Sequence, residues 1–221
     1  MTPTSLLPMI TLEDVIRLPE GDSSERLQLV TTQGPITCRL HPADGEDAIL
    51  WVFGAGGGLG GPAGGLYTRL GGQFQHAGVA SLELAYRRAG YLHDCVADVL
   101  VGLAHLESTG KRRIVLVGHS FGGAVVINAG VISEAVIAVA ALSSQAAGAD
   151  VVDQLSPKPV LFIHGERDEV LPASCSKDLH ARAGEPKELI LYPGCLHGLD
   201  QCREELDRDL TRWLRRVLAA S

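Results

Sequence analysis

Short, nearly continuous apolar runs recur along this chain and alternate with helical patterns. They occupy residues 48–53, 79–86, 113–117, 135–142, 160–164 and 188–192. Apolar residues at almost every position, instead of every second one, are typical of strands that are covered on both faces of a parallel sheet. Parallel neighbours need crossover connections, which helices supply. The alternation therefore predicts an α/β fold with a mostly parallel, doubly wound sheet.

The segments between the runs carry helical periodicity. Residues 91–107 place these apolar side chains on one stripe: Leu92, Val96, Val99, Leu103 and Leu106. The last segment repeats this pattern with Leu206, Leu210, Trp213, Leu214 and Val217. We also expect a short helix between Pro172 and Gly184, and a buried helix over residues 124–129. Residues 26–41 are typical of two strands around a turn, so the sheet is expected to open with an antiparallel hairpin.

The length and charge of the chain limit what it can be. A chain of 221 residues without internal repeats or a linker is predicted to form one domain, residues 1–221. The formal charge of −7 argues against a nucleic-acid partner, because such proteins concentrate Lys and Arg. No window resembles a signal peptide or reaches the roughly 20 apolar residues of a membrane span. We therefore expect a cytoplasmic protein without a membrane partner.

The cysteines and histidines form no metal-binding pattern. The five cysteines are odd in number and contain no CxxC pair, so we expect neither a disulfide framework nor a zinc site. We interpret all of them as reduced thiols: Cys38, Cys95, Cys175, Cys195 and Cys202. The eight histidines have no HxxxH or HxH spacing. The sequence therefore predicts no metal ion.

A glycine-flanked serine follows one of the predicted central strands. Residues 118–122 read GHSFG, and an apolar helix comes next. Strand, G-x-S-x-G and helix together indicate a nucleophile elbow, a sharp turn that holds the serine in a strained backbone conformation. Gly118 and Gly122 support the turn because side chains there would collide with the neighbouring elements. We predict that Ser120 is a nucleophile and that the amide of Phe121 donates to an oxyanion.

Two later strand ends supply the other groups that a serine nucleophile needs. Glu166, Asp168 and Glu169 follow one predicted strand, and His197 follows the next. A neutral imidazole accepts the serine proton, and a buried carboxylate fixes its tautomer and stabilises the imidazolium. Because the carboxyl ends of parallel strands meet at one edge, we expect serine, acid and histidine to form a triad there.

The glycine-rich residues 53–58 allow two interpretations. Small residues let backbone N–H groups approach a substrate carbonyl, so Ala55 is the predicted second oxyanion donor, supported by Gly54 and Gly56. The same stretch begins a formal G-x-G-x-x-G pattern with Glu83 downstream, as in dinucleotide-binding proteins. That pattern begins after a hairpin and not in an opening βαβ unit, so we favour the oxyanion loop.

These motifs together resemble the α/β-hydrolase superfamily from about residue 26 to the C-terminus. Residues 164–172, HGERDEVLP, match the family's HGxxDxxxP pattern, and this resemblance selects Asp168 as the acid. The compact chain is similar to the dienelactone-hydrolase-like group of small esterases. Dienelactone hydrolases themselves use a cysteine nucleophile where this chain has Ser120, so their lactone substrate is not carried over. Only residues 143–158 fill the place of the usual lid, so the resemblance implies an α/β-hydrolase fold with no cap domain.

The resemblance implies a serine hydrolase that acts on small carboxylic esters or thioesters through an acyl-enzyme on Ser120. Its base is His197, its orienting acid is Asp168, and no cofactor is expected. Two alternatives stay open. One is an acyltransferase that uses the same acyl-enzyme, and the other is a binding or scaffold protein that retains the fold without its chemistry. The sequence does not specify the acyl-chain length or the oligomeric state.

Overall fold

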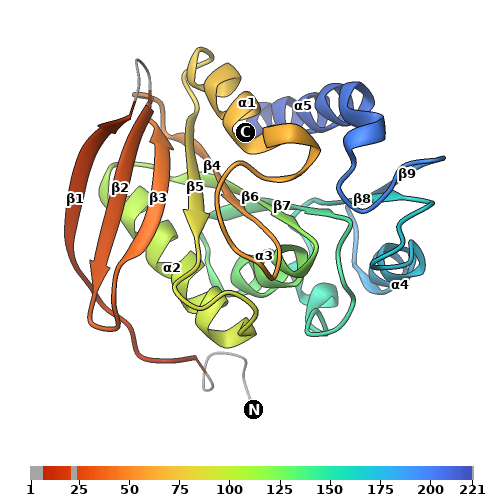
Figure 1. The fold of residues 1–221 in the computed structure, drawn as a ribbon, viewed down its shortest axis with the longest axis horizontal. Coiled ribbons are helices and arrows are strands. Elements are labelled where there is room, and N and C mark those ends of the chain that lie inside the picture. Colours follow the sequence, from red (N-terminus) through yellow and green to blue (C-terminus); the bar gives the residue numbers. More distant parts are fainter. Residues whose placement is uncertain (1–6, 21–23, 221) are drawn as a thin grey trace.

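The computed structural model describes residues 7–20 and 24–220, which form one nine-stranded mixed sheet (Figure 1). The strand order is β1-β2-β3-β5-β4-β6-β7-β8-β9. The strands are β1 (Leu12–Glu20), β2 (Ser24–Thr31), β3 (Ile36–His41), β4 (Asp47–Val52), β5 (Ala80–Ala85), β6 (Arg113–His119), β7 (Val136–Leu142), β8 (Val160–Gly165) and β9 (Lys187–Tyr192). Neighbours from β1 to β5 pair antiparallel, and all neighbours from β5 to β9 pair parallel.

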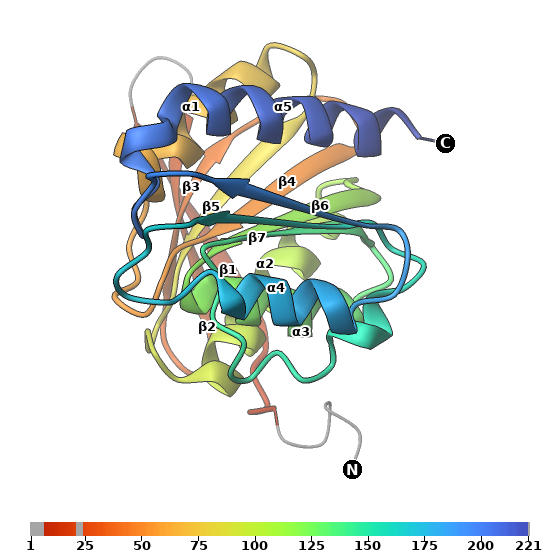
Figure 2. The same cartoon turned by 90° about the vertical axis from the view of Figure 1, so that its right-hand side faces the viewer.

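Helices cover both faces of the sheet (Figure 2). One face carries α1 (Pro62–Gln75) and α5 (Arg203–Ala219), and the other carries α2 (Leu92–Ser108), α3 (Phe121–Ile132) and α4 (Ser174–Arg182). Successive residues of a strand point to opposite faces. Accordingly Leu50 of β4 packs in the cluster with α2 and α3, whereas Trp51 packs in the cluster with α1 and α5. Both faces are apolar, which explains the continuous runs in the sequence.

The predicted fold class is confirmed. The six apolar runs are β4 to β9, with ends within two residues of the expected ones, and the hairpin of residues 26–41 is β2 and β3. In the described chain, the connection from β7 to β8 holds only a short 3-10 helix, Val152–Leu155, so the fold carries no cap there. The predicted helices correspond to α2, α3, α4 and α5.

Two elements were not predicted from the sequence, β1 and α1. Strand β1 adds an antiparallel edge to the hairpin. Helix α1 begins irregularly, because Ala63, Gly64 and Gly65 have left-handed backbone angles. Its regular part buries Leu66 and Tyr67 together with further apolar side chains one and two turns later. The many glycines in this segment have low helix propensity, so the sequence did not predict a helix here.

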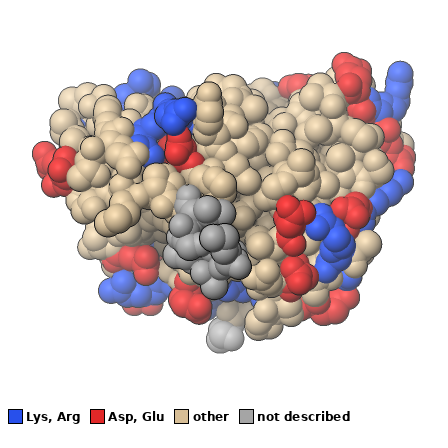
Figure 3. Space-filling view, turned by 90° about the horizontal axis from the view of Figure 1, so that it is seen from below, with Lys and Arg blue, Asp and Glu red and all other residues tan. Residues whose placement is uncertain are grey.

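The carboxyl ends of the parallel strands meet at one edge of the sheet, where the predicted site residues lie. Strand β5 points towards the lower side of Figure 1, and the view from that side shows Lys, Arg, Asp and Glu interspersed around a broad area without charge (Figure 3). None of the helices in the described residues is both long and apolar enough to cross a membrane.

Candidate active site

Ser120 occupies the turn between β6 and α3. Its backbone angles are φ 58° and ψ −122°, a conformation that non-glycine residues rarely adopt and that costs of order 1–3 kcal/mol. The turn needs glycine on both sides. A Cβ atom on Gly118 would collide with the carbonyl of Gly122, and a Cβ atom on Gly122 would collide with the carbonyl of Phe53. The sequence GHSFG thus folds into a tight elbow that leaves Ser120 partly exposed.

Of the three residues expected to form a triad, His197 lies within hydrogen-bond distance of both Ser120 and Asp168. His197 Nε2 is 3.0 Å from Ser120 Oγ, and His197 Nδ1 is 2.7 Å from Asp168 Oδ2. The side chain of Asp168 is fully buried, and that of His197 is 18% exposed. In this arrangement the serine hydroxyl donates to Nε2, and the N–H at Nδ1 donates to the carboxylate. These are the contacts that a nucleophile, a base and an orienting acid require.

Four N–H groups surround the carboxylate of Asp168. Oδ1 accepts the backbone N–H groups of Val170 at 2.9 Å and Leu171 at 2.8 Å. Oδ2 accepts from His197 and lies 3.0 Å from Nε2 of His164. Burial by itself raises the pKa of Asp168, but the hydrogen bonds from Leu171, His197 and Val170 outweigh burial and lower this pKa below its ordinary value. Asp168 is therefore ionised at neutral pH.

His119 packs against His197, the residue expected to act as the base. Its Nε2 lies 2.9 Å from the backbone carbonyl oxygen of His197, which can only accept, so Nε2 carries the proton. The ring of His119 lies 4.8 Å from that of His197 and 5.4 Å from that of Phe53. Burial lowers the pKa of His119 to about 4. His119 is therefore neutral at neutral pH, and it packs against His197 without adding a charge.

The glycine-rich loop after β4 lies against Ser120. A Cβ atom on Gly54 would lie 3.3 Å from Cβ and 3.7 Å from Oγ of the serine, so this backbone approaches it closely. A Cβ atom on Gly56 would meet nothing within 4 Å in the described chain. Ala55 follows Gly54, and Phe121 follows Ser120. Their amides therefore belong to the two segments that adjoin the hydroxyl, and both stay candidate oxyanion donors.

Glu83 has a structural role that disfavours the dinucleotide interpretation. Its side chain is 1% exposed. It accepts the backbone N–H of Gly60 at 2.6 Å and the hydroxyl of Thr68 at 2.8 Å, and it lies 3.4 Å from Arg39. Glu83 thus fixes the glycine-rich loop from inside the protein. A carboxylate enclosed in this way does not reach a ribose hydroxyl.

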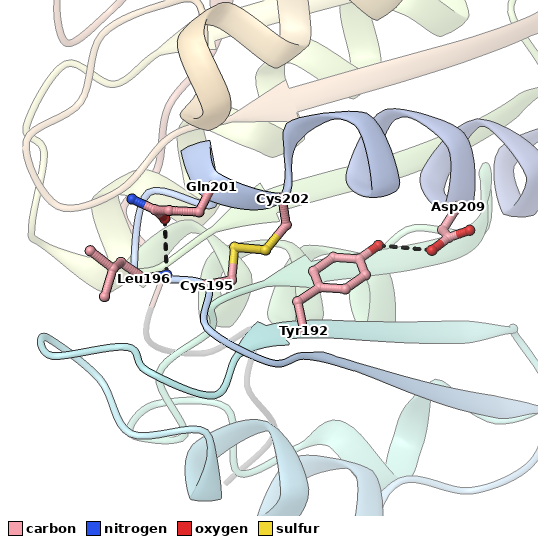
Figure 4. Close-up of a disulfide and its surroundings, with 6 residues drawn as sticks. All are labelled: Tyr192, Cys195, Leu196, Gln201, Cys202 and Asp209. Atoms are coloured by element: carbon pink, nitrogen blue, oxygen red, sulfur yellow. Dashed lines mark hydrogen bonds between the residues drawn. A yellow bond between two sulfur atoms is a disulfide. The ribbon is translucent and has the colours of Figure 1, made fainter.

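Cys195 and Cys202 form a disulfide (Figure 4), so the prediction that all five cysteines are reduced thiols is wrong for this pair. Their Cα atoms are 5.9 Å apart, because the chain turns back between them. The backbone N–H of Leu196 donates to Oε1 of Gln201 at 3.1 Å within this turn. The disulfide closes the loop that carries His197. Three cysteines remain free: Cys38, Cys95 and Cys175.

The sheet, its helices and the serine, histidine and carboxylate at its edge define an α/β hydrolase. More specifically, the chain belongs to the dienelactone hydrolase family, whose sequence model matches residues 64–212. A curated relative is the uncharacterized protein YfhR of Escherichia coli (strain K12), which is 29% identical over 147 residues. The match covers 56% of this chain and 51% of the relative, so it spans about half of that protein's length.

Solved structures share the same fold. Est1E from Butyrivibrio proteoclasticus has a TM-score of 0.74 at 16% identity, covering 94% of this chain and 100% of that one. XC6422 from Xanthomonas campestris, described as a member of the α/β serine hydrolases without lid, has a TM-score of 0.69 at 18% identity. That match covers 92% of this chain and 100% of the other. At these identities the likeness concerns the fold, which is that of a hydrolase without a lid.

Proposed function

We propose that this protein is a serine hydrolase that cleaves small carboxylic esters or thioesters through an acyl-enzyme on Ser120. The observation that carries the proposal is the continuous hydrogen-bond path from Ser120 Oγ through His197 to the buried carboxylate of Asp168. Each step of the path is 3.0 Å or shorter, so a proton can leave the hydroxyl as the oxygen attacks.

Acylation begins when Ser120 Oγ attacks the carbonyl carbon and its proton passes to His197 Nε2. The tetrahedral intermediate carries an oxyanion, to which the backbone amides of Phe121 and Ala55 donate. When the intermediate collapses, the bond to the alcohol or thiol breaks, and the leaving group takes the proton from His197. Asp168 stays ionised and stabilises the imidazolium throughout.

Deacylation repeats these steps with water. His197 accepts a proton from the water molecule, which attacks the carbonyl carbon of the acyl-enzyme. Collapse of the second intermediate breaks the ester bond to Ser120, and the serine oxygen takes the proton back. The carboxylic acid then leaves. An alcohol, amine or thiol in place of water would make the protein an acyltransferase, and product analysis with added acceptors separates the two outcomes.

The absence of a cap in the described chain favours small substrates. The connection from β7 to β8, where a lid would be inserted, is short and holds only the 3-10 helix Val152–Leu155. An open site encloses little of a long acyl chain, so it suits small soluble esters, or acyl groups on larger carriers, better than long-chain lipids.

The direct test compares the variant Ser120→Ala with Ser174→Ala, which changes an exposed serine at the start of α4. We expect Ser120→Ala to lower hydrolysis of p-nitrophenyl acetate by about 10³-fold or more and to abolish labelling by a fluorophosphonate probe. The control should behave as wild type. Wild-type turnover in Ser120→Ala would refute the assignment, and a folded wild type without labelling or turnover would favour the scaffold alternative.

A further inference from the structure

A second imidazole, that of His164, contacts the carboxylate of Asp168. His164, on β8, is fully buried. Its Nε2 lies 3.0 Å from Asp168 Oδ2 and 3.0 Å from the carbonyl oxygen of Leu171. Neither oxygen has a hydrogen to donate, because the carboxylate is ionised and a carbonyl only accepts. Nε2 of His164 therefore carries the proton. Its N–H donates to the carbonyl oxygen of Leu171 and lies at the same distance from Oδ2 of Asp168.

Ser176 fixes this tautomer from α4. Its Oγ lies 2.7 Å from Nδ1 of His164, and its side chain is fully buried. Burial lowers the pKa of His164, so the ring is neutral at neutral pH, and Nδ1 has a lone pair when the proton sits on Nε2. The hydroxyl of Ser176 therefore donates to Nδ1. Without this donor the ring would be free to place its proton on Nδ1 and turn a lone pair towards the carboxylate.

Two serine–histidine pairs thus converge on one carboxylate oxygen. One pair, Ser120 and His197, is partly exposed. The other pair, Ser176 and His164, is fully buried. Both imidazoles place a ring nitrogen beside Oδ2 of Asp168. Nδ1 of His197 donates to it at 2.7 Å, and Nε2 of His164, which also contacts the carbonyl of Leu171, lies 3.0 Å from it. The buried pair leaves no ring nitrogen of His164 unsatisfied. An apolar side chain could fill the same space without the cost of burying two polar groups.

We propose that His164 and Ser176 are positioning residues for the hydrolytic reaction. His164 holds the carboxylate of Asp168 in line with His197 and takes up part of its negative charge, and Ser176 holds His164 in the tautomer that does so. The inference rests on the proposed function, because it assigns these residues to the same triad. The titratable groups that face His164 are Asp168 on the loop after β8 and His197 on the loop after β9, and His119 contacts His197 from the end of β6.

Two variants at position 164 distinguish a role of His164 in positioning Asp168 from a role in filling space. In His164→Gln the amide N–H group can reach the place of Nε2, whereas His164→Leu keeps volume but has no donor. We expect His164→Leu to lower kcat by about 10- to 100-fold with KM within about twofold, and we expect His164→Gln to recover most of the loss. Turnover is counted per site labelled by a fluorophosphonate, so that unfolded protein does not enter the comparison.

The pH profile of kcat tests charge sharing, in which His164 takes up part of the negative charge of Asp168. Without the donor at position 164, the full charge of Asp168 acts on His197 and favours the imidazolium. The acid limb of the kcat profile in His164→Leu should therefore move to higher pH by about half a unit. An unchanged kcat per labelled site and an unchanged acid limb would overturn the proposal. A limb that moves to lower pH would contradict charge sharing.

A spectroscopic readout makes the test independent of turnover. The proton between His197 Nδ1 and Asp168 Oδ2 should give a far-downfield ¹H NMR resonance. We expect Ser176→Ala and His164→Leu to displace it, and the neighbouring change Ser174→Ala to leave it in place. If the resonance is the same in all four proteins, His164 and Ser176 do not position the acid. If it moves but wild type hydrolyses no ester, the proposed function fails and the positioning contact stands.

Discussion

At the scale of single residues, His119 is expected to make the free energy of unfolding depend on pH. Its pKa is lowered to about 4 by burial, whereas an exposed histidine in the unfolded chain titrates near 6.5. The unfolded state therefore binds a proton at higher pH than the folded state. The stabilisation from neutral His119 is fully present above pH 6.5 and is lost as the pH falls towards 4.

The expected loss is about 2 kcal/mol between pH 7 and pH 5. Urea unfolding of wild type and His119→Gln at both values measures it. The variant lacks the titrating ring, so its free energy of unfolding should fall by less on acidification. Equal falls in the two proteins would show that other groups carry the acid sensitivity.

Single residues differ in how far the sequence predicts them. Ser120, Asp168 and His197 were identified because each follows a recognisable strand and because their order matches a known family. The contact between His119 and His197 joins residues 78 positions apart, and it depends on how two loops pack. Ser176 lies on a helix whose sequence gives no reason to pair it with His164. Such contacts follow from the tertiary fold and not from local pattern.

At the scale of elements, the packing of α3 against the sheet depends on glycine. A Cβ atom on Gly122 would collide with the backbone carbonyl of Phe53, and backbone cannot move aside as a flexible side chain can. We expect Gly122→Ala to lower the free energy of unfolding by about 1–3 kcal/mol.

Gly72 of α1 is the matched control. A Cβ atom there would meet nothing within 4 Å of the described chain, and its backbone is not in the left-handed region. Gly72→Ala should stabilise the protein by about 0.5–1 kcal/mol, because alanine is the better helix former. Denaturant unfolding measures both variants. A Gly122→Ala protein as stable as wild type would mean that the elbow tolerates a side chain.

The disulfide between Cys195 and Cys202 closes a short loop between β9 and α5. Replacing both cysteines with serine should lower the free energy of unfolding by about 2 kcal/mol, as closure of a loop of this length implies. The variant Cys175→Ser, which changes a partly buried free cysteine and leaves the disulfide intact, is the control. In denaturant without reductant, thiol titration of wild type should count the three free cysteines. A count of five would exclude the disulfide.

At the scale of the whole molecule, the sequence predicted the parallel half of the sheet better than its antiparallel edge. The buried strands are apolar at most positions, which is a strong signal. By contrast, β1 leaves Ile16 and Leu18 about half exposed and has no regular alternation, so its sequence resembles a loop. The disulfide was missed for a similar reason, because only the folded turn brings Cys195 to Cys202. The cytoplasmic location and the single domain stay predictions.

The order of the first three strands has a consequence for how the molecule opens. Strands β1, β2 and β3 follow one another along the chain and stand side by side at one end of the sheet, separated by β5 and β4 from β6, after which Ser120 lies. Each can detach in turn without breaking a ladder among the parallel strands, so local opening is expected to proceed inward from β1. Amide hydrogen exchange should accordingly slow stepwise from β1 to β4. Uniform protection across these strands would mean that the whole sheet opens as one unit.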